Sequence, residues 1–180
     1  EYGPHLNAST GYDKTIYKLK IPTKDPAIIQ KGILVLADFA GEVSFKEQAF
    51  ENERKVVVEE WRKSLGSSER QREKLIKIHF ANSRYAERRP IGKVDLIKTF
   101  EPQRARDFYH EWYRPELMAV IAIGDFEKEN IVSLIKEHFS SLTNPTQARP
   151  REVYSVPLTT KDSVHFVTDT EETTTLLQVL

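Results

Sequence analysis

An apolar run of seven residues, Leu117–Ile123, constrains the fold of this chain more than any other feature of its sequence. The run contains no polar side chain and ends at Gly124 and Asp125, so exposing either side of it to water is unfavourable. A continuous apolar run of this length, bounded by a turn signal, is typical of a strand that is buried on both faces. The sequence therefore predicts a sheet in which this run is a central strand.

A second strand is predicted over residues 13–22, with residues 6–10 extending it upstream. Along this segment, side chains alternate between an apolar face, which includes Tyr17 and Leu19, and a face with lysines at 14, 18 and 20. This alternation is typical of a strand with one solvated face, and Pro22 ends it.

Helical periodicity and capping residues predict six helices. They span 26–40, 44 to about 65, 69–81, 94–99, 102–112 and 127–139. Asp25-Pro26 is a start signal for the first helix, and the residues from Ser44 to Glu47 match a capping box for the second. Residues 140–151 have a linker composition, and short strand-like pieces follow at 153–156, 164–168 and 173–180. The predicted fold is an α+β two-layer sandwich, a mostly antiparallel sheet with helices packed on one face.

Composition excludes several classes of function. The 180 residues contain 27 Lys and Arg against 27 Asp and Glu, and this balance argues against nucleic acid or an anionic membrane as the main partner. No apolar run approaches the roughly 20 residues that span a bilayer. The chain has no cysteine, so any metal must be held by His, Asp or Glu.

Two acids on the second predicted helix, Glu53 and Glu60, are separated by seven residues. Seven residues are nearly two helical turns, so both side chains project from one face with an offset of about 20°. Either this face is ordinary solvated surface, paired with basic neighbours such as Arg54 and Arg62, or the two acids face a site together. The spacing leaves both interpretations open.

Histidines do not add a metal motif. None of the five histidines stands four residues from another, so no one-turn zinc-binding pair is present, and we expect structural roles for all five. The first residues, from Glu1 to His5, include neither an initiator Met nor a signal-peptide core, and this start is typical of an excised or processed piece.

Three stretches, taken in order, resemble a known family. They are HLNASTGYDKTIYKLKIP at 5–22, FENERKVVVEEW at 50–61 and FYHEWYRPELMAVIAIGDF at 108–126. From about residue 6 to 142 the chain is similar to the N-terminal domain of the pitrilysin/insulinase family of zinc metallopeptidases, the M16-type family with an inverted zinc motif, which includes the mitochondrial processing peptidase. The resemblance implies the two-layer fold of that peptidase.

The resemblance also assigns roles to the two acids. It implies that Glu60 is a zinc ligand and that Glu53 is the assisting acid, while the remaining ligands and the general base come from a His-x-x-Glu-His helix. That motif is absent from the 180 residues, and in the family it would lie roughly 15 to 20 residues before Glu1. We therefore expect a fragment that neither holds Zn²⁺ tightly nor cleaves peptides alone, although the intact protein binds zinc and is an endopeptidase.

Substrate recognition is the part that this fragment is expected to keep. By resemblance, Asn7, Ala8, Ser9 and Thr10 form an edge strand, to which a peptide or small-protein substrate adds as another strand. The implied layout is a truncated peptidase domain at 1–142, a linker at 143–157 and the start of a second homologous domain at 158–180. Other domains of the same chain are then partners, and the location is the periplasm or cell envelope if the source is bacterial.

Two other functions stay open. Some members of the family keep the fold without the histidine motif and act as substrate-binding or structural subunits. Retention of both Glu53 and Glu60 favours the catalytic branch, because a non-catalytic copy needs neither acid. A general peptide-binding module is the third interpretation, in which a change at Glu60 has no effect on activity.

Overall fold

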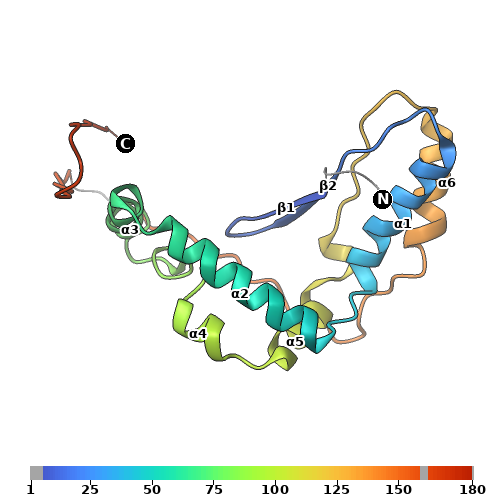
Figure 1. Ribbon diagram of the computed structural model, residues 1–180, viewed down its shortest axis with the longest axis horizontal. Helices are drawn as coiled ribbons and strands as arrows, with labels where there is room; N and C mark the ends of the chain where they lie inside the picture. The colour runs from blue at the N-terminus through green and yellow to red at the C-terminus, as the bar shows by residue number, and fades with distance from the viewer. Residues whose placement is uncertain (1–5, 159–161, 180) are drawn as a thin grey trace. The chain divides into compact units, whose positions relative to one another are not determined.

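The chain is mostly helical, with one small antiparallel sheet, in the computed structural model shown in Figure 1. The structure describes residues 6–158 and 162–179. In chain order the elements are β1 (Leu6–Thr10), β2 (Thr15–Leu19), α1 (Pro26–Gly41), α2 (Glu47–Ser64), α3 (Ser67–His79), η1 (Arg84–Ala86), α4 (Val94–Thr99), α5 (Pro102–Trp112), η2 (Pro115–Leu117) and α6 (Lys128–Phe139). The first of two compact units contains the described residues up to Phe50 together with Glu101–Arg151. The second contains Glu51–Phe100 and the described residues from Glu152 onward.

All six predicted helices are confirmed, with differences at their ends. At the start of α1, the Oδ1 atom of Asp25 accepts a hydrogen bond from the Ala27 N–H at 2.9 Å, and Pro26 occupies the first turn. The predicted capping box at Ser44 is wrong. Phe45 has a φ of 45°, which a right-handed helix does not accommodate, so α2 begins at Glu47 instead.

The sheet is a two-stranded hairpin. β1 and β2 are antiparallel, with Asn7 opposite Lys18 and Ser9 opposite Ile16. Residues 6–10 were predicted to extend the second strand upstream, and this is wrong because the chain reverses between the two segments. At the reversal, the Gly11 N–H donates a hydrogen bond to the Lys14 carbonyl oxygen at 2.8 Å.

The predicted central strand at 117–123 is not a strand in this structure. The segment carries no ladder, and Ile121 and Ile123 are 78% and 92% exposed. Ladder hydrogen bonds require a neighbouring strand, and the sheet in the described part of the chain ends at β1 and β2. The described residues of 153–156, 164–168 and 173–180 likewise form no ladder. The predicted two-layer sandwich with a mostly antiparallel sheet is therefore reduced here to a helical chain with one hairpin.

Helices pack on one face of that hairpin. The Tyr17 ring of β2 stacks on Phe39 of α1 with centroids 5.2 Å apart, and its hydroxyl lies 2.6 Å from the hydroxyl of Tyr113. Burial, followed by this hydrogen bond, raises the pKa of the Tyr17 phenol. Gly32 allows the close approach of α1, because a Cβ there would lie 2.6 Å from the Ile21 side chain. The hairpin is thus fixed to α1 and to the end of α5.

The core of the first unit lies around α1, α5 and α6. Ile33, Ala37, Tyr109 and Ile131 are buried, and the Tyr109 hydroxyl donates to the Phe39 carbonyl oxygen at 2.9 Å. Figure 1 shows α1 and α6 side by side, and the contacts between these helices agree. The side of β2 that carries Tyr17 faces this core.

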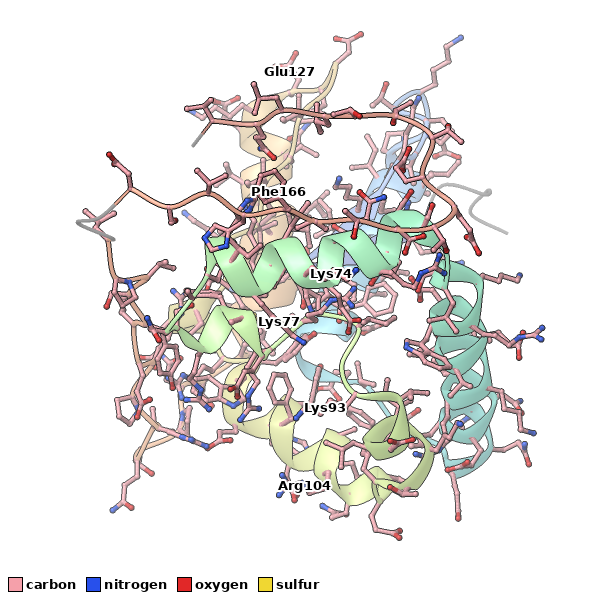
Figure 2. The ribbon with its side chains drawn as sticks, turned by 90° about the vertical axis from the view of Figure 1, so that its left-hand side faces the viewer. Lys74, Lys77, Lys93, Arg104, Glu127 and Phe166 are labelled. Atoms are coloured by element: carbon pink, nitrogen blue, oxygen red, sulfur yellow. The ribbon has the colours of Figure 1, made fainter. Side chains whose placement is uncertain are left out.

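In the second unit, α3 binds the turn at 168–172. The Arg70 guanidinium donates two hydrogen bonds of 2.7 Å to the Asp169 carboxylate, and the Lys74 Nζ donates to the Thr168 carbonyl oxygen at 2.7 Å. Figure 2 labels Lys74 on α3 and Phe166 on the adjacent segment. The Arg70 contact lowers the pKa of Asp169 to about 2.

Candidate functional site

The two acids singled out by the sequence lie on α2 and are exposed to solvent. Helix geometry puts the Cα atoms of Glu53 and Glu60 about 10.5 Å apart along the axis, on nearly the same face. Neither carboxylate forms an ion pair with a described residue. The pair is therefore available to a ligand or to another part of a protein.

The two arginines next to these acids in sequence, Arg54 and Arg62, are paired with other carboxylates. Arg62 binds Glu59, with its Nε 3.0 Å from the carboxylate, and Arg54 binds Glu51 at 3.0 Å. These i,i+3 pairs use two of the cations on which the solvated-surface interpretation depends. The neighbouring acid Glu59 is engaged, whereas Glu60 is not.

Arg54 has a second function that the sequence did not indicate. Its side chain is 12% exposed, and its guanidinium donates to the carbonyl oxygens of Ile97 and Phe100, the second at 2.7 Å. These carbonyls lie at the C-terminal end of α4, where helix carbonyls lack intrahelical donors. Arg54 thereby joins α2 to α4 and fixes the helix that carries both acids.

The predicted substrate-binding residues form most of β1, and all four side chains, those of Asn7, Ala8, Ser9 and Thr10, are exposed. Paired residues of an antiparallel ladder alternate between those that exchange hydrogen bonds and those that do not. Gly11 and Lys14 are a hydrogen-bonded pair, so Ser9 and Asn7 direct their main-chain groups to β2 as well. Ala8 and Thr10 then direct their N–H and C=O groups to the opposite edge of β1.

The described residues do not form a zinc site by themselves. In 6–158 and 162–179, no group of three or more His, Asp or Glu side chains is placed to hold a metal ion. A catalytic zinc needs three protein ligands and an open position. His5, one of the five histidines, lies outside the described residues. The donor set present here therefore does not fit a complete zinc centre.

A cavity of about 310 Å³ lies in the first unit, away from the predicted residues of β1. Its lining includes Gly41, Tyr109, Tyr113, Arg114 and Leu142. Arg114 is buried, and its Nε lies 2.7 Å from the Glu116 carboxylate while its NH2 group donates to the Arg149 carbonyl oxygen. The ion pair with Glu116 compensates the buried charge of Arg114, so we assign this arginine a structural role.

None of the described helices is both long and apolar enough to cross a bilayer.

Comparison with protein families covers nearly the whole chain. Residues 1–89 match the family model described as "Insulinase (Peptidase family M16)", and residues 99–180 match "Peptidase M16 inactive domain". The chain belongs to the insulinase family of peptidases. The resemblance inferred from three short stretches is thus confirmed, and the two glutamates of α2 lie within the part that matches the peptidase model.

Relatives in the insulinase family are named as zinc proteases. The chain is 33% identical over 162 residues to the probable zinc protease PqqL of Haemophilus influenzae, which covers 89% of this chain and 18% of that protein. It is 35% identical over 158 residues to a PQQL-like zinc protease of Arabidopsis thaliana. The chain therefore spans less than one fifth of the length of these relatives, 18% and 16%.

Solved structures of two proteases show the same fold. The first half of the periplasmic protease PqqL from Escherichia coli matches with a TM-score of 0.80 and 31% identity, over 86% of this chain and 33% of that one. A mutant of the ferredoxin protease FusC, in complex with Arabidopsis ferredoxin, also matches with a TM-score of 0.80, at 29% identity over 88% of this chain and 18% of that one.

Proposed function

We propose that this 180-residue chain is part of a zinc-dependent metalloendopeptidase and that the chain is inactive in isolation. The observation that carries the proposal is a pair of exposed carboxylates, Glu53 and Glu60, on α2 of an insulinase-family chain, neither of which forms an ion pair within 6–158 and 162–179. The short share of each zinc protease that the chain covers supports a contribution to a larger catalytic unit.

In this proposal, Glu60 supplies one carboxylate ligand to a zinc ion whose other ligands come from a longer protein. Glu53 acts as the assisting acid beside that site, where a carboxylate orients ligands and tunes their basicity. Arg54 keeps α2 in place through α4. The described residues alone supply too few ligands, so 1–180 by itself is expected to bind zinc weakly.

The acids are tested in the full-length gene product that contains this segment. Glu60→Gln removes a ligand charge and is expected to abolish stoichiometric zinc, measured by metal analysis after dialysis. Glu53→Gln is expected to keep the zinc and to lower peptide cleavage by about 10- to 100-fold.

Glu59→Gln is the matched control. It removes the same charge one residue away, but Glu59 is bound to Arg62 and points about 100° from Glu60. We expect it to retain both zinc and activity. Full zinc occupancy in the Glu60→Gln protein would contradict the proposal.

The edge of β1 that faces away from β2, and with which no described strand pairs, is called its free edge and is the proposed peptide-binding element. Ala8 and Thr10 present main-chain groups there, and a peptide that adds as a third strand bonds to them. Backbone groups dominate such binding, so the side chains of Asn7 and Ser9 act on specificity rather than on the pairing itself.

Proline substitution separates the two edges of β1. Ala8→Pro removes an N–H from the free edge and leaves the ladder to β2 intact, so it is expected to weaken peptide binding without unfolding the hairpin. Asn7→Ala, a side-chain change, is the control and is expected to retain binding. Binding is measured by fluorescence anisotropy with a labelled extended peptide. Equal affinity of the Ala8→Pro protein and the parent would contradict edge pairing.

The domain layout is proposed from the sequence: a truncated peptidase domain at 1–142, a linker at 143–157 and the start of a second homologous domain at 158–180. The remaining domains of the longer protein would then be partners. A periplasmic or cell-envelope location is supported by the description of the Escherichia coli relative as periplasmic.

A non-catalytic role is the second candidate, favoured by the match of residues 99–180 to a domain described as inactive. The chain would then belong to a substrate-binding or structural subunit. Metal analysis and cleavage assays of the full-length protein separate the two candidates, since a non-catalytic subunit binds peptide but neither holds zinc nor cleaves.

A further inference from the structure

One face of the hairpin carries a row of lysines. Tyr17 and Leu19 point toward the helices, so the alternation of a strand puts Lys14, Lys18 and Lys20 on the opposite face, at and just beyond the ends of β2. All three are exposed, and none forms an ion pair with a described residue. This lysine face is a local positive surface on a chain with no net charge.

β1 contributes only small side chains to the lysine face. Asn7 lies opposite Lys18, and Ser9 lies opposite Ile16. Gly11, opposite Lys14 at the turn, has no side chain at all. Nothing bulky on β1 therefore separates the lysines from a strand added at its free edge.

The dimensions of a sheet bring such a strand within reach. Neighbouring strands lie about 4.8 Å apart, so a third strand next to β1 would lie about 10 Å from β2. Long side chains interact with neighbours beyond the directly opposite residue, and the lysine ammonium is carried on a flexible four-carbon stem. Alternate side chains of the added strand would share the face with Lys14, Lys18 and Lys20.

We propose that the free edge of β1 prefers extended peptides with acidic side chains at every second position, recognised by the lysine face. This inference rests on the proposed peptide binding at β1 and names its substrate class. The ammonium groups attract carboxylates across the small β1 side chains, while the β1 backbone holds the peptide. The other face of the added strand would adjoin Ala8, Thr10 and the aromatic side of the hairpin, without a charge requirement.

The test uses the 180-residue chain and labelled peptides of alternating composition, Glu-Thr, Gln-Thr and Lys-Thr, in anisotropy titrations. The Glu-Thr peptide is expected to bind about five- to tenfold more tightly than the Gln-Thr peptide, and the Lys-Thr peptide most weakly. The preference is expected to collapse in 1 M salt, where the screening length is about 3 Å.

Lys18→Glu is expected to remove or reverse the preference for the acidic peptide, and Lys128→Glu is the matched control. Lys128 is exposed in the first turn of α6 of the same unit, so its reversal changes net charge equally but leaves the lysine face intact. Circular dichroism and the NMR signals of β1 and β2 check that the hairpin is retained.

Each outcome has a distinct meaning. Equal binding of the acidic and neutral peptides, with no effect of Lys18→Glu, would overturn the lysine-face inference while edge pairing stands. An acidic peptide interrupted by proline cannot pair as a strand. If it bound as tightly as the Glu-Thr peptide, the inference would also be overturned, because the lysines would then attract acidic peptides without strand pairing. Absence of binding by all peptides would instead remove the proposed function of β1 and this inference with it.

Discussion

Arg54 shows how one residue holds in place the helix that carries the two proposed site residues. The guanidinium is nearly buried, and a buried cation is tolerated only when its donors are satisfied. The N–H groups of the Arg54 guanidinium donate to the Glu51 carboxylate and to the carbonyl oxygens of Ile97 and Phe100. The Cζ atom of Arg54 also lies over the Phe100 ring, 4.9 Å from its centroid. The orientation of α2, and with it the direction of Glu53 and Glu60, depends on this side chain.

Replacement of Arg54 should therefore lower the stability of the fold by more than the loss of an exposed ion pair would. Arg54→Met leaves the carbonyls of Ile97 and Phe100 without their donors, and we expect the free energy of unfolding to fall by about 2–3 kcal/mol in urea titrations. Arg62→Met, which breaks an exposed pair with Glu59, is the control and should change it by less than about 0.5 kcal/mol. Similar losses for both variants would contradict this account.

At this scale the sequence indicated the two acids but not their support. The spacing of Glu53 and Glu60 is a local property that helix geometry reads directly. Where Arg54 binds is not a local property, because its carbonyl partners at the end of α4 lie more than forty residues away. No local pattern encodes such a contact.

The turn at 168–172 is an element whose position depends on charge. Arg70 donates to Asp169 and lies 3.0 Å from Glu171, and Gln71 donates to Glu172 at 3.0 Å. Arg70 and Gln71 are adjacent in α3, and Lys74, which donates to the Thr168 carbonyl oxygen, lies one helical turn further on, so the contacts hold the turn against the N-terminal half of the helix.

Acid should release this turn. The pKa of Asp169 is lowered from 3.8 to about 2 by Arg70, so its contribution to stability is full above the unfolded value and is lost as pH falls from about 4 through about 2. The NMR signal of the Arg70 Nε–H should follow this titration between pH 5 and 2. Asp169→Asn should give the released signal already at neutral pH, whereas Glu171→Gln should shift it less. An unchanged Arg70 signal in Asp169→Asn would contradict the assignment.

Helices and strands differed in how well the sequence predicted them. The periodicity and caps of a helix lie within the segment itself, as at Asp25-Pro26, and all six helices were found. A strand exists only with a partner, and the run at 117–123 has none in the described chain. β2 was predicted correctly as a strand, but the reversal at Gly11 was missed because its turn lacks a strong hairpin dipeptide.

At the scale of the whole molecule, the apolar segment at 117–123 is exposed to solvent, although its composition is typical of a buried strand. An uncharged seven-residue segment without proline or glycine and with high strand propensity favours association when it is exposed. The same composition that predicts a buried strand thus predicts self-association of the isolated chain.

We expect concentration-dependent association that the double variant Ile121→Thr/Ile123→Thr reduces, measured by sedimentation velocity. Val56→Thr is the control: it removes an exposed aliphatic side chain from the helix α2 instead of from the apolar segment, and it should leave association unchanged. A monomeric parent chain at all concentrations would contradict the expectation.

For the molecule as a whole, family membership was recoverable from sequence because three stretches kept their order and spacing, and the family models agree. The site residues stay a prediction. The glutamates and the β1 residues were named from the resemblance, while the register that separates Ala8 and Thr10 from Asn7 and Ser9 required the hairpin itself.

The length of β1 carries a consequence for substrate size. Five residues of strand measure about 17 Å, and alternate residues of such an edge face outward. In the proposed function, the length of this edge limits how many peptide residues can pair with it. A dipeptide pairs with only a fraction of β1, whereas a pentapeptide pairs along its full length. Affinity should therefore rise with peptide length and level off near five residues, whatever the order of the side chains.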